Sequence, residues 1–134
     1  MFNVLGSIIA AVVGMFFGFL WFSNFLFGKS WRAEMKWSDE EMEANKNKGM
    51  TKEIILGLFA EFVTAMVFSY FLTTLGIVGV GPAMVVAFWA WLGFSATVQF
   101  GATLWAKHTM KLFLINTSHR LVEFLLIAIV LSLF

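Results

Sequence analysis

The sequence predicts an all-α membrane protein: a bundle of four transmembrane helices, with both termini outside and a short amphipathic or interfacial helix in the first cytoplasmic loop. Of its 134 residues, 60% are hydrophobic and only 13% are charged, and the mean hydropathy is +0.87. This composition lies outside the range of soluble domains. Four segments also have the roughly 20 apolar residues that a helix needs to cross a bilayer.

The four apolar segments are residues 2–27, 54–77, 82–106 and 110–134, with a cytoplasmic loop over 28–53, and together they form a single domain over 1–134. The first segment should remain as a transmembrane helix, because it lacks the basic start and the cleavage site of a secretory signal. Pro82 suits the first turn of the third helix, because proline has no backbone N–H and an N–H at that position would have no acceptor within the helix.

The basic residues predict the orientation. Six lie in the first loop and Lys107 and Lys111 lie in the third connection, whereas the N-terminus, residues 78–81 and the C-terminus carry none. Since Lys and Arg concentrate in cytoplasmic loops, both basic connections should be cytoplasmic and both termini outside.

The first loop contains two local patterns. Ser38 and Glu41 form a capping-box pattern, which predicts a short helix. Aromatic and basic residues precede it and indicate an interfacial collar, with rings at headgroup level and cations toward anionic lipid; these are Trp31, Met35 and Trp37 with Lys29, Arg32 and Lys36. A binding site for a soluble partner on residues 39–43 is the alternative.

Small residues recur at intervals of four in two helices. They are Gly6, Ala10, Gly14 and Gly18 in the first helix, and Gly93, Thr97 and Gly101 in the third. Small residues let neighbouring backbones approach closely in a membrane. Each stripe therefore predicts a packing face, either within the monomer or between subunits.

The fourth helix carries a polar stripe. Asn116, Arg120 and Glu123 are spaced i, i+4 and i+7 on one face, with His119 at its edge. Ionised groups within a bilayer are costly and nearly always face the bundle interior or water, where they pair. Arg120 and Glu123 are three residues apart and can pair within the helix.

Depth in the membrane predicts a partner on another helix. Glu61 follows Glu53 by eight residues and Arg120 follows Lys111 by nine, so both lie about 12 to 14 Å inside the cytoplasmic surface at the helical rise of 1.5 Å. Glu61 and Arg120 should therefore meet.

Together these positions predict a ligand or ion pocket in the cytoplasmic half, beneath a dry outer half. Its residues are Glu61, Gln99, Asn116, His119, Arg120 and Glu123, with Trp21 and Asn24 at the inner rim. Two carboxylates face one arginine, which leaves one negative charge. A protonated His119, a proton on either glutamate or a bound cation could balance it. The alternative is a buried ionic network that only fixes helix register.

Three short stretches resemble a bacterial family of small four-helix membrane proteins catalogued as a domain of unknown function. They are GFLWFSNFLFGKSW (Gly18 to Trp31), WLGF (Trp91 to Phe94) and KLFLIN (Lys111 to Asn116). Phe22 stands where the family pattern has tyrosine. The resemblance covers essentially the whole chain and implies four helices in the bacterial inner membrane, but no activity.

Three functions remain open from the sequence. The favoured one is a homo-oligomeric channel or carrier for a small solute or ion, with the first glycine stripe as the subunit interface. The second is a lipid-binding, hydrophobic-ligand-binding or scaffold role. The third is a metal-dependent enzyme using Glu61, Glu123 and His119, although there is no HExxH motif and no cysteine. The sequence favours a protein that is not an enzyme, and it indicates no catalytic residue, no cofactor and no nucleic-acid partner. It does not show whether a metal is bound.

Overall fold

The computed structural model describes residues 2–36 and 38–134, and the secondary structure within them is helical. The helices are α1 (Val4–Trp21), α2 (Gly28–Met35), α3 (Asp39–Lys48), α4 (Thr51–Thr74), α5 (Val80–Trp91), the π-helix η1 (Leu92–Ala96), α6 (Thr97–Trp105) and α7 (Met110–Leu133). Four of the described spans are long and apolar enough to cross a membrane: α1, α4, the continuous rod α5–η1–α6, and α7. The all-α prediction with four such helices is confirmed.

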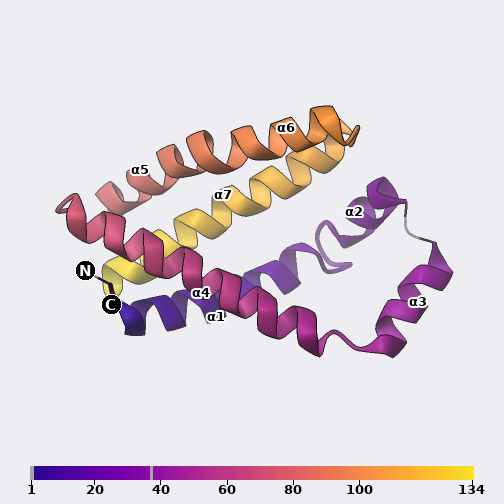
Figure 1. Ribbon diagram of the computed structural model, residues 1–134, viewed down its shortest axis with the longest axis horizontal. Coiled ribbons are helices and arrows are strands. Elements are labelled where there is room, and N and C mark those ends of the chain that lie inside the picture. Colours follow the sequence, from indigo (N-terminus) through magenta and orange to yellow (C-terminus); the bar gives the residue numbers. More distant parts are fainter. Residues whose placement is uncertain (1, 37) are drawn as a thin grey trace.

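Helix α7 organises the bundle. It packs against α1 and against α5, and α1 in turn packs against α4, whereas α4 contacts α7 less extensively. Both termini lie at one end of the molecule, here called the terminal end, and α2 and α3 lie at the other, here called the loop end (Figure 1). The α1–α4 pair and the α6–α7 pair diverge toward the loop end (Figure 1).

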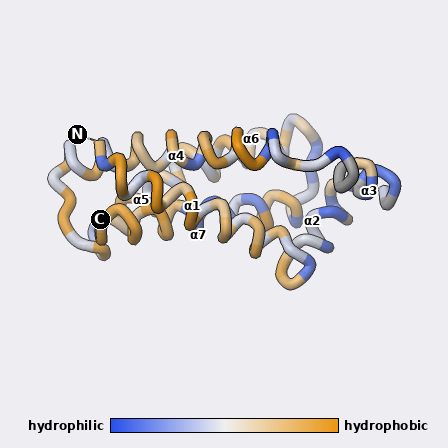
Figure 2. The backbone as a smooth tube through the Cα atoms, turned by 90° about the horizontal axis from the view of Figure 1, so that it is seen from below, coloured by the Kyte–Doolittle hydropathy of each residue, from blue (hydrophilic) through white to orange (hydrophobic). Residues whose placement is uncertain are grey.

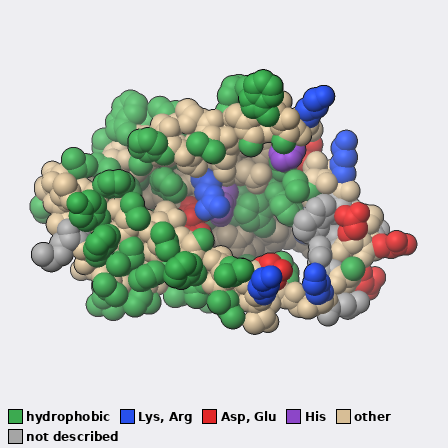
Figure 3. Space-filling view, in the orientation of Figure 1, with side chains coloured by type: hydrophobic (Ala, Val, Ile, Leu, Met, Phe, Trp, Pro, Cys, Tyr) green, Lys and Arg blue, Asp and Glu red, His purple; other side chains and the backbone are tan. Residues whose placement is uncertain are grey.

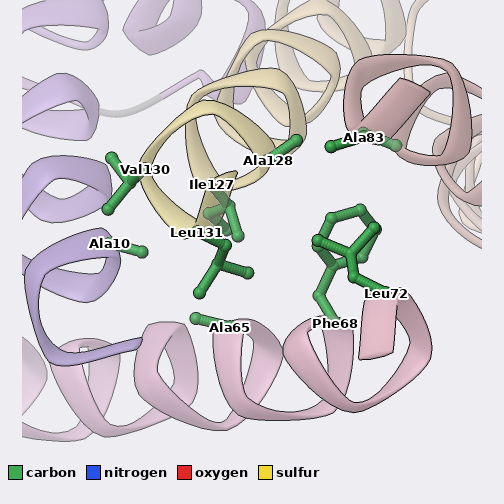
Figure 4. Close-up of a cluster of buried hydrophobic side chains, with 10 residues drawn as sticks. Ala10, Ala65, Phe68, Leu72, Ala83, Ile127, Ala128, Val130 and Leu131 are labelled. Atoms are coloured by element: carbon green, nitrogen blue, oxygen red, sulfur yellow. The ribbon is translucent and has the colours of Figure 1, made fainter. Parts of the chain in front are cut away.

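The hydrophobic core fills the terminal end. Alanines stand where helices approach most closely: Ala10, Ala65, Ala87 and Ala128 are each at most 1% exposed. Small side chains permit such approach, and larger ones fill the remaining space. Figure 4 shows Phe68, Leu72, Ile127, Val130 and Leu131 converging on this cluster from α4 and α7.

The outward faces of the spans are apolar. Large side chains such as Phe16 and Val98 are 67 to 68% exposed. Figure 2 shows hydrophobic residues along the spans and hydrophilic residues gathered around α3 at the loop end. A soluble monomer rarely exposes apolar surface on this scale, whereas lipid would cover it.

The predicted first segment covers residues 2–27, whereas α1 begins at Val4 and ends at Trp21. The chain then turns, and the Phe27 N–H bonds the Trp21 carbonyl at 2.9 Å. Gly28 closes the turn, where a Cβ would lie 2.3 Å from the Phe22 carbonyl oxygen. Hydropathy did not reveal this turn because residues 25–27 are as apolar as the helix before them.

The predicted short loop helix is present, and a second one accompanies it. Helix α3 begins after Ser38, whose Oγ accepts from the Glu41 N–H at 3.1 Å, as the capping pattern predicted. Helix α2 occupies the segment predicted as a collar. Trp37, part of that collar, lies outside the described residues.

The third span is not one regular α-helix, as the predicted segment 82–106 implied. Its middle turn, η1, is a π-helix over Leu92–Ala96, and the Thr97 hydroxyl donates to the Gly93 carbonyl at 2.8 Å. A π-helical turn inserts one residue and changes the direction of the following side chains, and such turns often occur at functional sites. Here it brings Phe94 and Ser95 to the groove described next.

Candidate functional site

A groove of about 530 Å³ extends from the loop end into the middle of the bundle. It follows α4 from the N-cap residue Met50 to Thr64, about four helical turns. Figure 3 shows this face hollowed, with basic, acidic and histidine side chains beside the hollow. Its walls come from α1, α4, η1 and α7: Met15, Phe19, Met50, Glu53, Ile54, Gly57, Ala60, Glu61, Thr64, Phe94, Ser95, Arg120 and Phe124.

An ion cluster lies deep in the groove. Arg120 Nη1 is 2.9 Å and 3.0 Å from the two carboxylate oxygens of Glu123, and 3.9 Å from Glu61 Oε1. The Glu123 side chain is fully buried, that of Glu61 is 12% exposed and that of Arg120 is 45% exposed. The predicted meeting of Glu61 and Arg120 is thus present, and Glu123 is the closer partner.

The glycine stripe of α1 makes room for this cluster. A Cβ at Gly14 would lie 2.8 Å from Glu61 Oε2, and one at Gly18 would lie 3.6 Å from His119 Nε2. Gly6 faces the side chain of Asn3, and Ala10 belongs to the core. The stripe is therefore a packing face within one chain. Gly14 and Gly18 already meet side chains of α4 and α7, and the use of the stripe as a subunit interface stays a prediction.

His119 sits in an aromatic enclosure beside the cluster. Its ring lies parallel to Phe17, with centroids 5.3 Å apart, and close to Phe22 and Trp21. Its Nδ1 is 3.6 Å from Glu123 Oε2. Two buried polar atoms here have no hydrogen-bond partner among the described residues: His119 Nε2 and Glu61 Oε2. Trp21 was predicted at the inner rim, but Phe17 and Phe22 were not assigned to the site, because their sequence pattern does not distinguish them from lipid-facing phenylalanines.

Gln99 lies apart from the ion cluster, although it was predicted to line the pocket. Its side-chain oxygen accepts from the Thr117 hydroxyl at 2.8 Å, so it joins α6 to a different face of α7. Trp91 Nε1 donates to the Thr117 carbonyl at 2.9 Å on the same face. Gln99 is therefore not among the residues that line the groove.

The remaining predicted residues lie around the cluster. Asn116 is half-buried one turn before Arg120. At the rim, Trp21 Nε1 donates to the Ile115 carbonyl at 3.2 Å, and the exposed Asn24 accepts from Arg32. Both rim residues therefore fasten the turn after α1 to its surroundings and lie outside the groove lining.

The small residues of the third span do not pack within the chain. Gly93 and Gly101 each have open space where a Cβ would be, and Thr97 is exposed. This second stripe faces outward from the monomer, in contrast to that of α1.

Within residues 2–36 and 38–134, no three His, Asp or Glu side chains are grouped so that they could hold a metal ion. What the geometry offers is an excess of buried carboxylate over arginine, beside a groove wide enough for a small ligand. Such an arrangement suits the binding of a proton or a cation.

Comparison with known proteins gives a family but no activity. No curated protein and no solved structure matches the chain. A family model described as "Protein of unknown function (DUF1761)" matches residues 5–132, nearly the full length. The chain therefore belongs to this family, as the three sequence stretches indicated.

Proposed function

We propose that the protein is a membrane carrier for a small solute or ion, with a protonatable binding site in the groove. One observation carries this proposal: the groove runs from the loop end to a cluster in which two largely buried carboxylates face one half-exposed arginine. Intramembrane charges next to a cavity typically mark solute or proton pathways.

A carrier fits the packing better than an open channel does. The core at the terminal end is closed by side chains that are at most 9% exposed, among them Ile127 at 2%. A pore through the monomer would require this core to separate. Access from one side, followed by a rearrangement that exposes the cluster to the other side, requires no permanent pore.

The charges favour a cation or a proton as the bound species. Glu53 lines the groove near its mouth and Glu61 lies deeper, whereas Arg120 is the basic residue of the lining. With Glu123 buried beneath, the acidic groups outnumber the basic one. An acidic cavity with low-dielectric walls concentrates cations.

Orientation and assembly belong to the same proposal. The loop end faces the cytoplasm of a bacterial inner membrane, on the basis of its lysines and arginines. The carrier is a homo-oligomer whose interface uses an outward face. Gly93 and Gly101 on the third span have no neighbouring atoms on their open side and offer such a face. Gly14 and Gly18 of α1 already pack against Glu61 and His119.

Flux into liposomes tests the proposal. Purified protein reconstituted with an internal pH-sensitive dye should conduct protons, or a tested cation, down an imposed gradient. Glu61→Gln should abolish the flux, and Glu43→Gln, on the exposed surface of α3, should not. A tight membrane containing folded wild-type protein, or equal flux in both variants, would contradict the proposal.

A second candidate is the binding of a lipid or another hydrophobic ligand. The walls of the same groove include Met15, Phe19, Phe94 and Phe124. Mass spectrometry of protein released from its native membrane would distinguish the two. A retained amphiphile that Phe124→Ala releases would favour this second function over ion handling.

A further inference from the structure

The ion cluster contains one more negative charge than positive charge. Both carboxylates contact the same guanidinium nitrogen, Glu123 at 2.9 Å and Glu61 at 3.9 Å. Arg120 can balance one of them. An uncompensated charge in a buried site is costly, so a second positive charge or a bound proton is required.

His119 is poorly placed to carry that charge. An imidazolium needs an acceptor for both ring N–H groups. Its Nε2 is buried without a partner, and its plane is within 1° of that of Phe17, so an Nε2–H would not point at the face of that ring. His119 is therefore expected to be neutral.

The two carboxyl groups are held next to each other, because one guanidinium nitrogen of Arg120 pairs with both. Ionised carboxylates are acceptors only, so a hydrogen bond between them requires a proton on one. The second oxygen of Glu61 is buried against Gly14, without a donor from the described residues. A carboxylic acid tolerates such surroundings better than an ionised group does.

We infer that Glu61 and Glu123 share one proton, so that with Arg120 the cluster is electrically neutral. The proton joins α4 to α7, whose side chains share the core at the terminal end but whose backbones approach closely at few positions. The charged groups facing the pair are Glu53 from α4 and His119 and Arg120 from α7. The contributions of α1 and η1 to the groove, Met15, Phe19, Phe94 and Ser95, carry no charge.

The inference deepens the proposed function, on which it rests for the use made of the proton: the proton would be the coupling ion of the carrier. Since Glu61 lines the groove, the proton can exchange with water from the loop end. A cation entering the groove could take its place, because it would supply the same charge to the two carboxylates.

Infrared spectroscopy of the protein in lipid nanodiscs at neutral pH tests the shared proton. Wild-type protein should show the C=O band of a protonated carboxyl group, shifted in heavy water. Glu61→Gln and Glu123→Gln should each lose that band, since the remaining carboxylate then pairs with Arg120 alone. Glu43→Gln should keep it. Absence of the band in the wild type, or its persistence in either of the first two variants, would overturn the inference.

Two further measurements keep the test decisive if a variant does not fold. Solid-state NMR of wild-type protein with labelled glutamate should detect one protonated carboxyl close to a glycine, as Glu61 is to Gly14. A doubly protonated His119, or no protonated carboxyl, would overturn the inference. A band without flux would refute the carrier alone, and flux without a band would refute the shared proton alone.

Discussion

Replacing Arg120 with glutamine removes the cation that both buried carboxylates contact. Breaking a buried ion pair from one side typically costs about 3 to 5 kcal/mol, because the remaining charge is left unpaired. The Arg120 side chain is 45% exposed, so water already screens part of its interaction. We therefore expect Arg120→Gln to lower the free energy of unfolding by about 3 kcal/mol, at the lower end of that range.

The distances predict how this loss divides between the two glutamates. Glu123 is fully buried and 2.9 Å from Arg120 Nη1, whereas Glu61 is partly exposed and 3.9 Å away. Double-mutant cycles should give a coupling energy of about 2 kcal/mol for Arg120 with Glu123 and about 1 kcal/mol for Arg120 with Glu61. In both cycles the double glutamine variant should lose less unfolding free energy than the two single variants lose together.

The assay is reversible unfolding in mixed micelles with increasing SDS, followed by tryptophan fluorescence. Trp21, one of six tryptophans that contribute to the signal, lies 6.0 Å from the His119 ring. Effects that add within about 0.5 kcal/mol in both cycles would refute the ionic network. A stronger coupling to Glu61 than to Glu123 would refute the arrangement of its partners.

Five further substitutions, two of them controls, test the packing by the same assay. Gly14→Ala should destabilise by about 1 to 3 kcal/mol, because its Cβ would lie 2.8 Å from a carboxylate oxygen, whereas Gly101→Ala meets open space and should be neutral or stabilising. Trp91→Phe loses a 2.9 Å hydrogen bond and should cost about 1 kcal/mol, while Trp89→Phe, 62% exposed, should cost almost nothing. Ile127→Ala, at a site only 2% exposed, should cost about 2 to 5 kcal/mol through the cavity it leaves. Equal effects within either pair, or a neutral Ile127→Ala, would contradict the packing described.

The sequence alone predicted the spans and the central ion pair. Hydropathy is sufficient for helices such as α4 and α7, because bilayer thickness sets their length. Glu61 and Arg120 could be paired because both helices start at the same surface and rise by the same distance per residue. The turn after Trp21 was missed because apolar residues continue through it.

Other features depended on three-dimensional contacts. A glycine spacing of four predicts close approach but not its partner, so the contact of Gly14 with Glu61 could not be anticipated. The depth of Gln99 was similar to that of Arg120, but its rotation about the helix axis directed it to Thr117. The π-turn η1 altered that rotation, and no residue pattern in WLGF indicated it.

The most direct test of the account is water access to the groove from the loop end only. The chain has no cysteine, so single-cysteine variants give an unambiguous signal. Ser95→Cys places a thiol in the groove lining, and Ser69→Cys places one in the buried terminal end, where Ser69 is 3% exposed. A membrane-impermeant maleimide, which needs a hydrated thiolate, should label Ser95→Cys in inside-out vesicles and leave Ser69→Cys unlabelled from either side. Labelling from neither side would contradict a water-filled groove at the loop end, and labelling from the opposite side only would contradict the proposed cytoplasmic position of that end.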